Sequence, residues 1–107
     1  MGKYLTFDVG TPAIKTCLFD STLSLMEKVG IEYDLLTEGD RVELLPSVYW
    51  DTMVKAVRKI GENHDLSDVT AICLTTQGET MIPVDRDGKV LHNAVVWLDG
   101  RAEKQGE

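Results

Sequence analysis

Positive charge is scarce in this sequence, which has 11 Lys and Arg against 18 Asp and Glu and a formal net charge of −7. Nucleic-acid binding needs Lys and Arg clustered against the phosphate backbone, so we expect no nucleic-acid partner. An acidic balance by itself favours solubility and indicates no particular ligand. The 107 residues suffice for one small domain or for part of a larger one.

Long apolar runs are also missing. No stretch approaches the roughly 20 residues that cross a bilayer, and no charged-then-apolar signal peptide opens the chain. Residues 1–6 (MGKYLT) fit the N-myristoylation pattern, but the residues that follow indicate a core strand that could not be spared for the modifying enzyme. We therefore expect no membrane partner and a cytoplasmic location.

Cysteine and histidine number two each. Cys17 and Cys73 lie in apolar runs without a CxxC or Cys/His pattern, so we predict two buried free thiols rather than a disulfide or a metal site. His64 and His92 are far apart and are expected at the surface. The sequence contains no GxxxxGK[ST], which excludes a P-loop protein.

The first half of the chain predicts strands. Residues 3–9 and 13–20 have strand composition and are joined by a tight turn at 10–12, which predicts an antiparallel hairpin. Residues 24–35 form a third apolar run, and residues 36–46 are mixed, with a loop expected at Glu38-Gly39-Asp40.

A helix is predicted to begin at Pro46, where the missing N–H costs nothing, and to stop near Gly61 or Asn63. Its apolar residues recur at helical spacing and predict one apolar stripe: Trp50, Met53, Val54, Val57 and Ile60.

The second half returns to strands. Residues 69–76 (VTAICLTT) are short and mostly apolar, which predicts a strand buried on both faces. Residues 80–84 and 90–97 flank a turn at 85–88, which predicts a hairpin. The Asp85-x-Asp87-Gly88 spacing is shared with calcium loops, but Val and Leu stand at the other ligand positions, and the hairpin explains it.

The predicted order is therefore β-β-β-α-β followed by a hairpin. This order is the opening of the ribonuclease H-like fold, the α/β core shared by actin-like ATPases. The chain shows no internal repeat, low-complexity segment or Pro/Gly/Ser-rich linker.

Three segments carry candidate chemistry, and the first is Asp8-Val9-Gly10-Thr11. Gly10, without a Cβ, lets the backbone approach a phosphate, while exposed N–H groups and the Thr11 hydroxyl can donate to phosphate oxygens. Asp8 can hold Mg²⁺ directly or through water, and Lys15 on the next strand is within reach of the same charge. An ordinary hairpin turn is the alternative for this segment alone.

The second segment, Gln77-Gly78-Glu79, follows the strand at 69–76, where α/β folds place ligands. Gln77 and Glu79 together offer donors and acceptors for neighbouring hydroxyls. The third segment contains Trp97, Asp99 and Arg101: an indole face can stack on a sugar ring, and the two charged residues can fix its hydroxyls. A polar connection, or a core Trp beside a surface ion pair, would explain either segment alone.

Together, the order and separations of these segments resemble the amino-terminal part of the FGGY carbohydrate kinases, which include xylulose and glycerol kinases. Residues 42–46 (VELLP) fit the V-E-x-x-P segment before a helix with tryptophan, and residues 85–89 fit the D-x-x-G-K hairpin. The resemblance covers nearly the whole chain.

The resemblance implies ATP and Mg²⁺ as cofactors and a sugar or polyol as substrate. It implies an ATP-phosphate and magnesium site, with Asp8 as the metal residue, formed by Asp8, Gly10, Thr11 and Lys15. It implies a substrate site formed by Gln77, Gly78, Glu79, Trp97, Asp99 and Arg101. In the family the catalytic base is an Asp much further along, so residues 1–107 are expected to be an incomplete amino-terminal domain, inactive alone.

Two departures from the family pattern bear on the substrate. Pro12 replaces a hydroxyl residue, which removes one phosphate donor and one N–H. Gly78 stands where glycerol kinases carry Arg and xylulose kinases carry Met, while Glu79 matches glycerol kinases. A ketose similar to xylulose is the favoured substrate.

Two alternatives to a sugar kinase remain open, and a partner expectation stands beside them. A non-catalytic or regulatory actin-like ATPase would have no reason to hold the two sugar segments. A ribonuclease H-type nuclease needs several carboxylates around two metals, and Asp8 has no evident partners. A homo-oligomer is possible, because an incomplete domain leaves a strand edge and apolar surface exposed.

Overall fold

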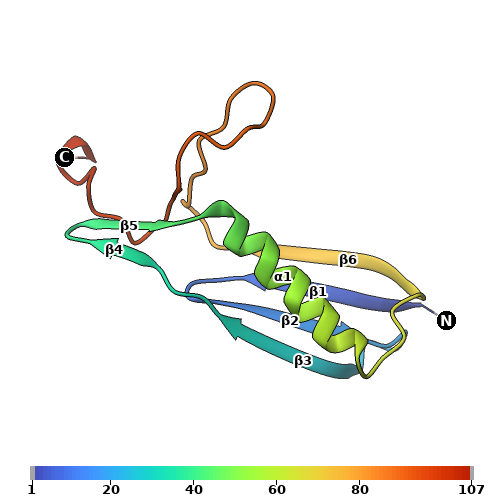
Figure 1. The fold of residues 1–107 in the computed structure, drawn as a ribbon. Coiled ribbons are helices and arrows are strands. Elements are labelled where there is room, and N and C mark those ends of the chain that lie inside the picture. The colour runs from blue at the N-terminus through green and yellow to red at the C-terminus, as the bar shows by residue number, and fades with distance from the viewer. Residues whose placement is uncertain (1, 107) are drawn as a thin grey trace.

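The computed structural model describes residues 2–106 as a four-stranded sheet with one long helix along one face, and a smaller sheet at one end (Figure 1). The elements are β1 (Lys3–Val9), β2 (Ala13–Phe19), β3 (Leu25–Glu32), β4 (Leu36–Glu38), β5 (Arg41–Leu44), α1 (Pro46–Gly61), β6 (Val69–Thr76), β7 (Ala94–Val95) and a 3₁₀ turn (Lys104–Gly106).

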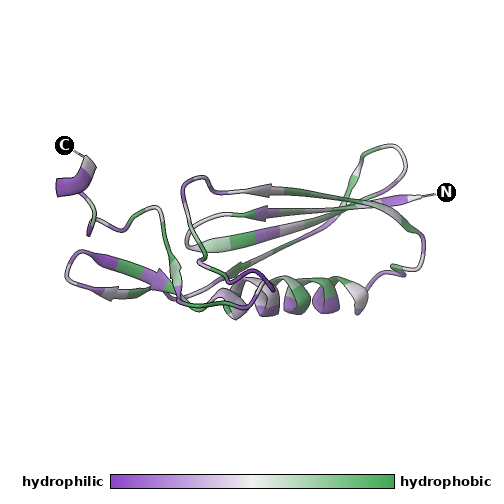
Figure 2. Ribbon diagram, turned by 90° about the horizontal axis from the view of Figure 1, so that it is seen from above, coloured by the Kyte–Doolittle hydropathy of each residue, from purple (hydrophilic) through white to green (hydrophobic). Residues whose placement is uncertain are grey.

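The large sheet has the strand order β3-β2-β1-β6. Strand β1 pairs antiparallel with β2 and parallel with β6, and β2 pairs antiparallel with β3. Helix α1 lies along the sheet on one side and returns the chain to β6, as Figures 1 and 2 show. The predicted β-β-β-α-β order is confirmed for the large sheet and its helix, in an α/β arrangement.

The core lies between α1 and the sheet because β1 and β2 alternate. Leu5, Phe7 and Val9 of β1 are buried on the helix side, whereas Asp8 between them is exposed. The buried residues of α1 are Thr52, Ala56 and Ile60, spaced four residues apart on one helical face. Within the predicted apolar stripe, Met53, Val57 and Ile60 pack in or against the core, whereas Trp50 is 67% exposed.

Strand β6 differs most from its prediction. Ile72 is 66% exposed and Leu74 is 55% exposed, so the prediction of burial on both faces was wrong. The strand lies at the sheet edge, and within residues 2–106 an apolar hollow of about 500 Å³ separates it from α1. An apolar run shows that a strand can be buried, but the surrounding elements decide whether it is. For the same reason Cys73 is exposed, against the prediction of buried thiols, while Cys17 is half-buried.

A second sheet, β4-β5-β7, was not predicted. The expected loop at residues 38–40 is the turn between β4 and β5, where Gly39 has φ +60°. The predicted turn at residues 85–88 is confirmed, with Gly88 at φ +84° and the Asp85 carboxylate accepting from the N–H groups of Asp87 and Lys89, both at 2.9 Å.

The strands predicted on either side of that turn were wrong in extent. They reduce to the isolated bridges Met81–Val95 and Val84–Val90, and the short β7 pairs with β5 instead. Val95 keeps both backbone hydrogen bonds to Met81, and β5 pairs along the other edge of β7, a long-range pairing that local sequence does not reveal. His92 is exposed as expected, whereas His64 is half-buried beside Glu27 at 3.0 Å. Among the described residues, no helix is long and apolar enough to cross a membrane.

Candidate functional site

The turn between β1 and β2 is held from both sides. The Gly10 N–H donates to the Ala13 carbonyl at 3.1 Å, and the Tyr33 N–H donates to the Pro12 carbonyl at 2.9 Å. The Tyr33 hydroxyl also donates to the Gly10 carbonyl. A Cβ on Gly10 would lie 3.2 Å from the Ala13 carbonyl oxygen, so this close approach favours glycine.

Asp8 and Lys15 are exposed and lie opposite each other in the β1–β2 register. Residues paired in this way point to the same sheet face, with Cβ atoms about 5 Å apart. A carboxylate and an ammonium group therefore stand together beside the turn, on the face away from the α1 core. This pair suits a metal-bound phosphate, because the carboxylate can ligate the ion and the ammonium can bind phosphate oxygens.

The turn offers fewer phosphate donors than the sequence suggested. The Gly10 N–H is used within the turn, and Pro12 has none. The Thr11 hydroxyl and Lys15 are the side-chain donors that remain. In the part of the chain that the structure describes, no three His, Cys, Asp or Glu gather into a metal cluster, so a magnesium ion at Asp8 would take its other ligands from water and phosphate.

The loop after β6 is tied to β1 and α1 through Gln77. Its backbone N–H donates to the Val9 carbonyl at 2.9 Å, and its side-chain Nε2 donates to the Tyr49 hydroxyl at 2.9 Å. The side-chain Oε1 is buried and has no hydrogen-bond partner among residues 2–106. Such an acceptor costs about 1–3 kcal/mol when left unpaired, so this loop has an unmet hydrogen bond.

Gly78 and Glu79 follow Gln77 in this loop. Glu79 has φ +64°, a left-handed conformation that is rare outside glycine. Gly78 has no atom within 4 Å of the position a Cβ would take, so the space beside it is open.

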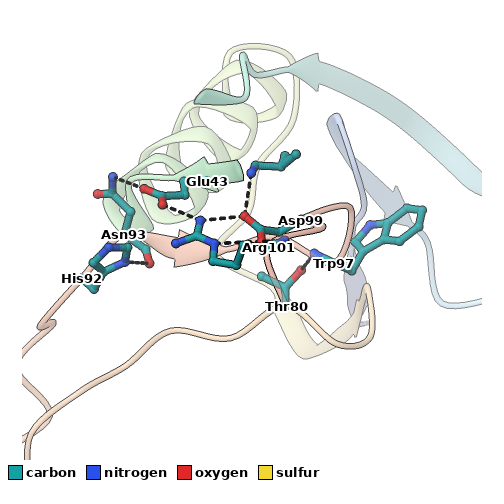
Figure 3. Close-up of polar contacts among 8 residues, drawn as sticks. Glu43, Thr80, His92, Asn93, Trp97, Asp99 and Arg101 are labelled. Carbon is teal, nitrogen blue, oxygen red and sulfur yellow. Dashed lines mark hydrogen bonds and ion pairs between the residues drawn. The ribbon is translucent and has the colours of Figure 1, made fainter. Parts of the chain in front are cut away.

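Trp97 contacts both the β1–β2 turn and the segment that follows β6. Its indole Nε1 donates to the Thr11 Oγ1 at 3.1 Å. Its backbone N–H donates to the Thr80 hydroxyl at 3.1 Å (Figure 3). The side chain remains 48% exposed. A hollow of about 490 Å³ is formed here by residues from three distant segments, namely Thr11, Gln77, Gly78, Glu79 and Trp97.

Asp99 and Arg101 lie in an ion-pair network with Glu43 of β5 (Figure 3). Arg101 Nη2 lies 2.6 Å from Asp99 Oδ2 and 2.5 Å from Glu43 Oε2. Asp99 Oδ2 also accepts from the Val42 N–H at 2.7 Å, which anchors the segment to β5. The Arg101 hydrogen bond holds the pKa of Asp99 well below its usual range, and Asp99 and Glu43 together raise the pKa of Arg101.

The predicted site residues therefore fall into three groups. Thr11 and Trp97 share the hollow with Gln77, Gly78 and Glu79. Asp8 and Lys15 lie on the sheet face beside the turn, and Asp99 and Arg101 lie in the network with Glu43; these four do not line the hollow.

Sequence reasoning missed Tyr33, Tyr49 and the role of Glu43. Glu43 could have been found, because it stands in the V-E-x-x-P segment and carries a charge close to a predicted helix start. The two tyrosines had no such signal, since nothing in the local sequence indicates what a phenol will contact.

Comparisons with known proteins identify carbohydrate kinases as relatives of this chain. The model of the FGGY family of carbohydrate kinases, N-terminal domain, matches residues 3–107. Glycerol kinase 1 of Saccharolobus solfataricus is 33% identical over 99 residues, 91% of this chain and 20% of its own length. A glycerol kinase of Rhizobium meliloti is 34% identical over 106 residues, 94% of this chain and 21% of its own length.

Solved structures share the fold. A ligand-bound xylulose kinase from Lactobacillus acidophilus superposes with a TM-score of 0.89 at 24% identity, over 98% of this chain and 21% of that one. The Plasmodium falciparum glycerol kinase with ADP gives a TM-score of 0.83 at 25% identity, over 98% and 22%. The chain spans about a fifth of the length of the curated relatives that it matches.

Proposed function

Since this chain belongs to the FGGY family of carbohydrate kinases, we propose that the protein containing it transfers a phosphoryl group from ATP to a hydroxyl of a sugar or polyol. Residues 1–107 would form part of its amino-terminal domain, and the reaction would take place in the cytoplasm. The segment by itself is expected to be inactive, because in this family the catalytic base lies further along the chain.

One observation carries the proposal. Thr11, from the turn expected to bind phosphate, lines the same hollow as Gln77, Glu79 and Trp97 from the two segments expected to bind sugar. The indole of Trp97 and the hydroxyl of Thr11 are 86 residues apart in sequence and hydrogen-bonded at 3.1 Å. Phosphoryl transfer needs the phosphate donor to lie beside the accepting hydroxyl, and the adjacency of these segments supports the proposal for that reason.

The chain's own residues have distinct tasks in this proposal. Asp8 holds the magnesium ion, and Lys15 and the Thr11 hydroxyl bind phosphate oxygens. Bound MgATP would supply the phosphoryl group and the charge neutralisation that its transfer needs. Gln77 and Glu79 bind neighbouring sugar hydroxyls, and the unpaired Gln77 Oε1 is an acceptor that a hydroxyl can satisfy after a small loop movement.

Arg101 would bind the substrate through the guanidinium nitrogen that its ion pairs leave free, and Asp99 would hold Arg101 in position. Arg101 uses Nε and Nη2 on Asp99 and Glu43, which leaves Nη1 without a partner among the described residues. A sugar hydroxyl can accept from Nη1 without disturbing the network, and Asp99 then fixes the guanidinium in place. Trp97, half-exposed, offers an indole face to the ring or carbon chain.

A five-carbon ketose similar to xylulose is the proposed substrate. The open space at Gly78 favours a larger substrate than glycerol, and the chain lacks the Arg that glycerol kinases carry there. A site that hydrogen-bonds a hydroxyl rejects analogues lacking it by as much as about 10⁴–10⁵, so the preferred sugar should stand out.

The test is a substrate panel on the full-length protein with ATP and Mg²⁺. ADP formation is measured with glycerol, xylulose, ribulose, fuculose, rhamnulose and gluconate, against ATP alone as the background. We expect the highest kcat/KM with a five-carbon ketose. A preference for glycerol would show that the argument from Gly78 is wrong, and no turnover above background with any of them would refute the kinase proposal.

A further inference from the structure

Two tyrosines lie between the phosphate turn and the sugar loop. Tyr33 directly follows β3 and is 8% exposed, and Tyr49 lies in the first turn of α1. Their ring centroids are 5.7 Å apart with an interplanar angle of 74°. This edge-to-face packing is a favoured aromatic arrangement, so the two rings act as one packed unit.

Each tyrosine is bonded to a different half of the site. Tyr33 grips the turn twice, through its N–H to the Pro12 carbonyl at 2.9 Å and through its hydroxyl to the Gly10 carbonyl. Tyr49 accepts from Gln77 Nε2 at 2.9 Å. A continuous path of contacts thus runs from the turn at residues 10–12 through both rings to the loop at residues 77–79.

Both phenols are neutral near neutral pH. Burial raises the pKa of Tyr33, against smaller lowering effects from the neighbouring hydroxyls of Thr11 and Tyr49. Burial, and then the nearby Tyr33, raises the pKa of Tyr49. The Tyr33 hydroxyl therefore keeps the proton that its bond to the Gly10 carbonyl requires, and neither phenol lines the hollow itself.

We propose that Tyr33 and Tyr49 are positioning residues that lock the turn at 10–12 to the loop at 77–79, and so fix the phosphate donor relative to the accepting hydroxyl. The inference rests on the proposed kinase function. Its physical reason is that transfer depends on the relative placement of two ligands, and a displacement of about 1 Å can cost about 10² in rate.

The test removes the hydroxyls and keeps the rings. Tyr33→Phe and Tyr49→Phe preserve the edge-to-face packing, so both variants should fold. The matched control is Tyr4→Phe, the same change at the remaining tyrosine, whose ring lies on the opposite sheet face with Thr6 and Cys73. The kcat and both KM values of the full-length protein are measured for the sugar that the wild type prefers.

Lost positioning should lower kcat while each ligand still binds. We expect kcat to fall roughly tenfold in each variant, with both KM values within about twofold of wild type. The double variant should be no slower than the slower single variant, because the two hydroxyls act through one path. Tyr4→Phe should match wild type. A lower thermal midpoint with unchanged kcat in both variants indicates a merely structural role and overturns the inference.

A second measurement separates this inference from the kinase proposal. Amide hydrogen exchange of the ligand-free full-length protein is followed at Gly10, Thr11, Gln77 and Gly78. Either substitution removes one hydrogen bond of the path that joins the turn to the loop. Amide exchange should therefore become faster in both segments. A wild type without turnover refutes the kinase proposal alone, and exchange then decides: unchanged exchange in both variants overturns the link between turn and loop.

Discussion

The indole N–H of Trp97 donates to the hydroxyl oxygen of Thr11 at 3.1 Å, which joins the β1–β2 turn to the chain's carboxyl-terminal region. Because the indole has no acceptor and the hydroxyl oxygen accepts, the Thr11 hydrogen stays available for a second partner. The contact therefore positions a hydroxyl donor at the edge of the hollow.

This contact predicts a fluorescence change. Residues 1–107 contain two tryptophans, Trp50 and Trp97, so Thr11 variants of the full-length protein are compared by difference spectra, in which emission from unaffected tryptophans cancels. Thr11→Val removes the acceptor, and the half-exposed indole turns to water, so we expect its emission maximum to shift to longer wavelength. Thr11→Ser keeps the hydroxyl and should match the parent spectrum. Identical spectra for the Val and Ser variants would contradict the contact.

Asp8→Asn tests the proposed magnesium residue. Asp8 is exposed on the sheet, so the change should leave the thermal midpoint nearly unaltered. A neutral amide is a poor magnesium ligand, and the loss of one well-placed electrostatic contact typically lowers the rate by roughly 10²–10³. Turnover of the full-length protein is measured across a magnesium titration, with Asp51→Asn on the exposed side of α1 as control. Wild-type turnover in the Asp8 variant would remove Asp8 from the site.

Gly78→Arg tests the substrate proposal. No atom lies within 4 Å of the Cβ position, so the longer side chain can enter without displacing the backbone. It should fill the space and add a donor, which lowers kcat/KM for the ketose relative to glycerol by roughly tenfold, the scale of about one hydrogen bond. Gly78→Ala adds no donor and should leave the ratio nearly unchanged. A ratio that does not move with Arg would show that the substrate lies elsewhere.

Glu79 stands in a strained backbone conformation with φ +64°. The left-handed region costs an L-residue about 1 kcal/mol or more, so Glu79→Gly should stabilise the protein by about 1 kcal/mol in urea unfolding. It should also raise the sugar KM, because the proposed carboxylate is lost. Leu23 has φ +66° in an exposed turn, so Leu23→Gly should give similar stabilisation with unchanged kinetics. An unchanged sugar KM in Glu79→Gly would exclude Glu79 from substrate binding.

The Asp99–Arg101 pair predicts a pH dependence of stability. The Arg101 hydrogen bond lowers the pKa of Asp99, so its contribution is present above the unfolded pKa of about 4 and is lost as the pH falls towards the folded value. The gap in thermal midpoint between wild type and Asp99→Asn should be widest near neutral pH and shrink below about pH 4. Arg101→Gln should weaken this pH dependence. A difference in thermal midpoint that stays constant down to about pH 2 would refute a stabilising role for the Asp99–Arg101 pair.

The sequence by itself determined the features that depend on near neighbours. Strand composition at residues 3–9 and 13–20, with a tight turn between them, indicated the β1–β2 hairpin, because such a hairpin depends on residues adjacent in sequence. Pro46 marked the start of α1, and Gly88 marked a turn that needs positive φ. The family resemblance rested on motif order and spacing, and the match of the family model to residues 3–107 confirmed it.

Only the tertiary structure decided which distant groups meet. The exposure of Ile72 depends on what packs beside β6, and the pairing of Arg101 with Glu43 joins residues 58 positions apart. The link between Tyr33 and Tyr49 likewise follows from packing α1 against the end of β3. Local propensity fixes the direction of a side chain, but its hydrogen-bond partner is set by whichever element the folded chain brings within about 3 Å.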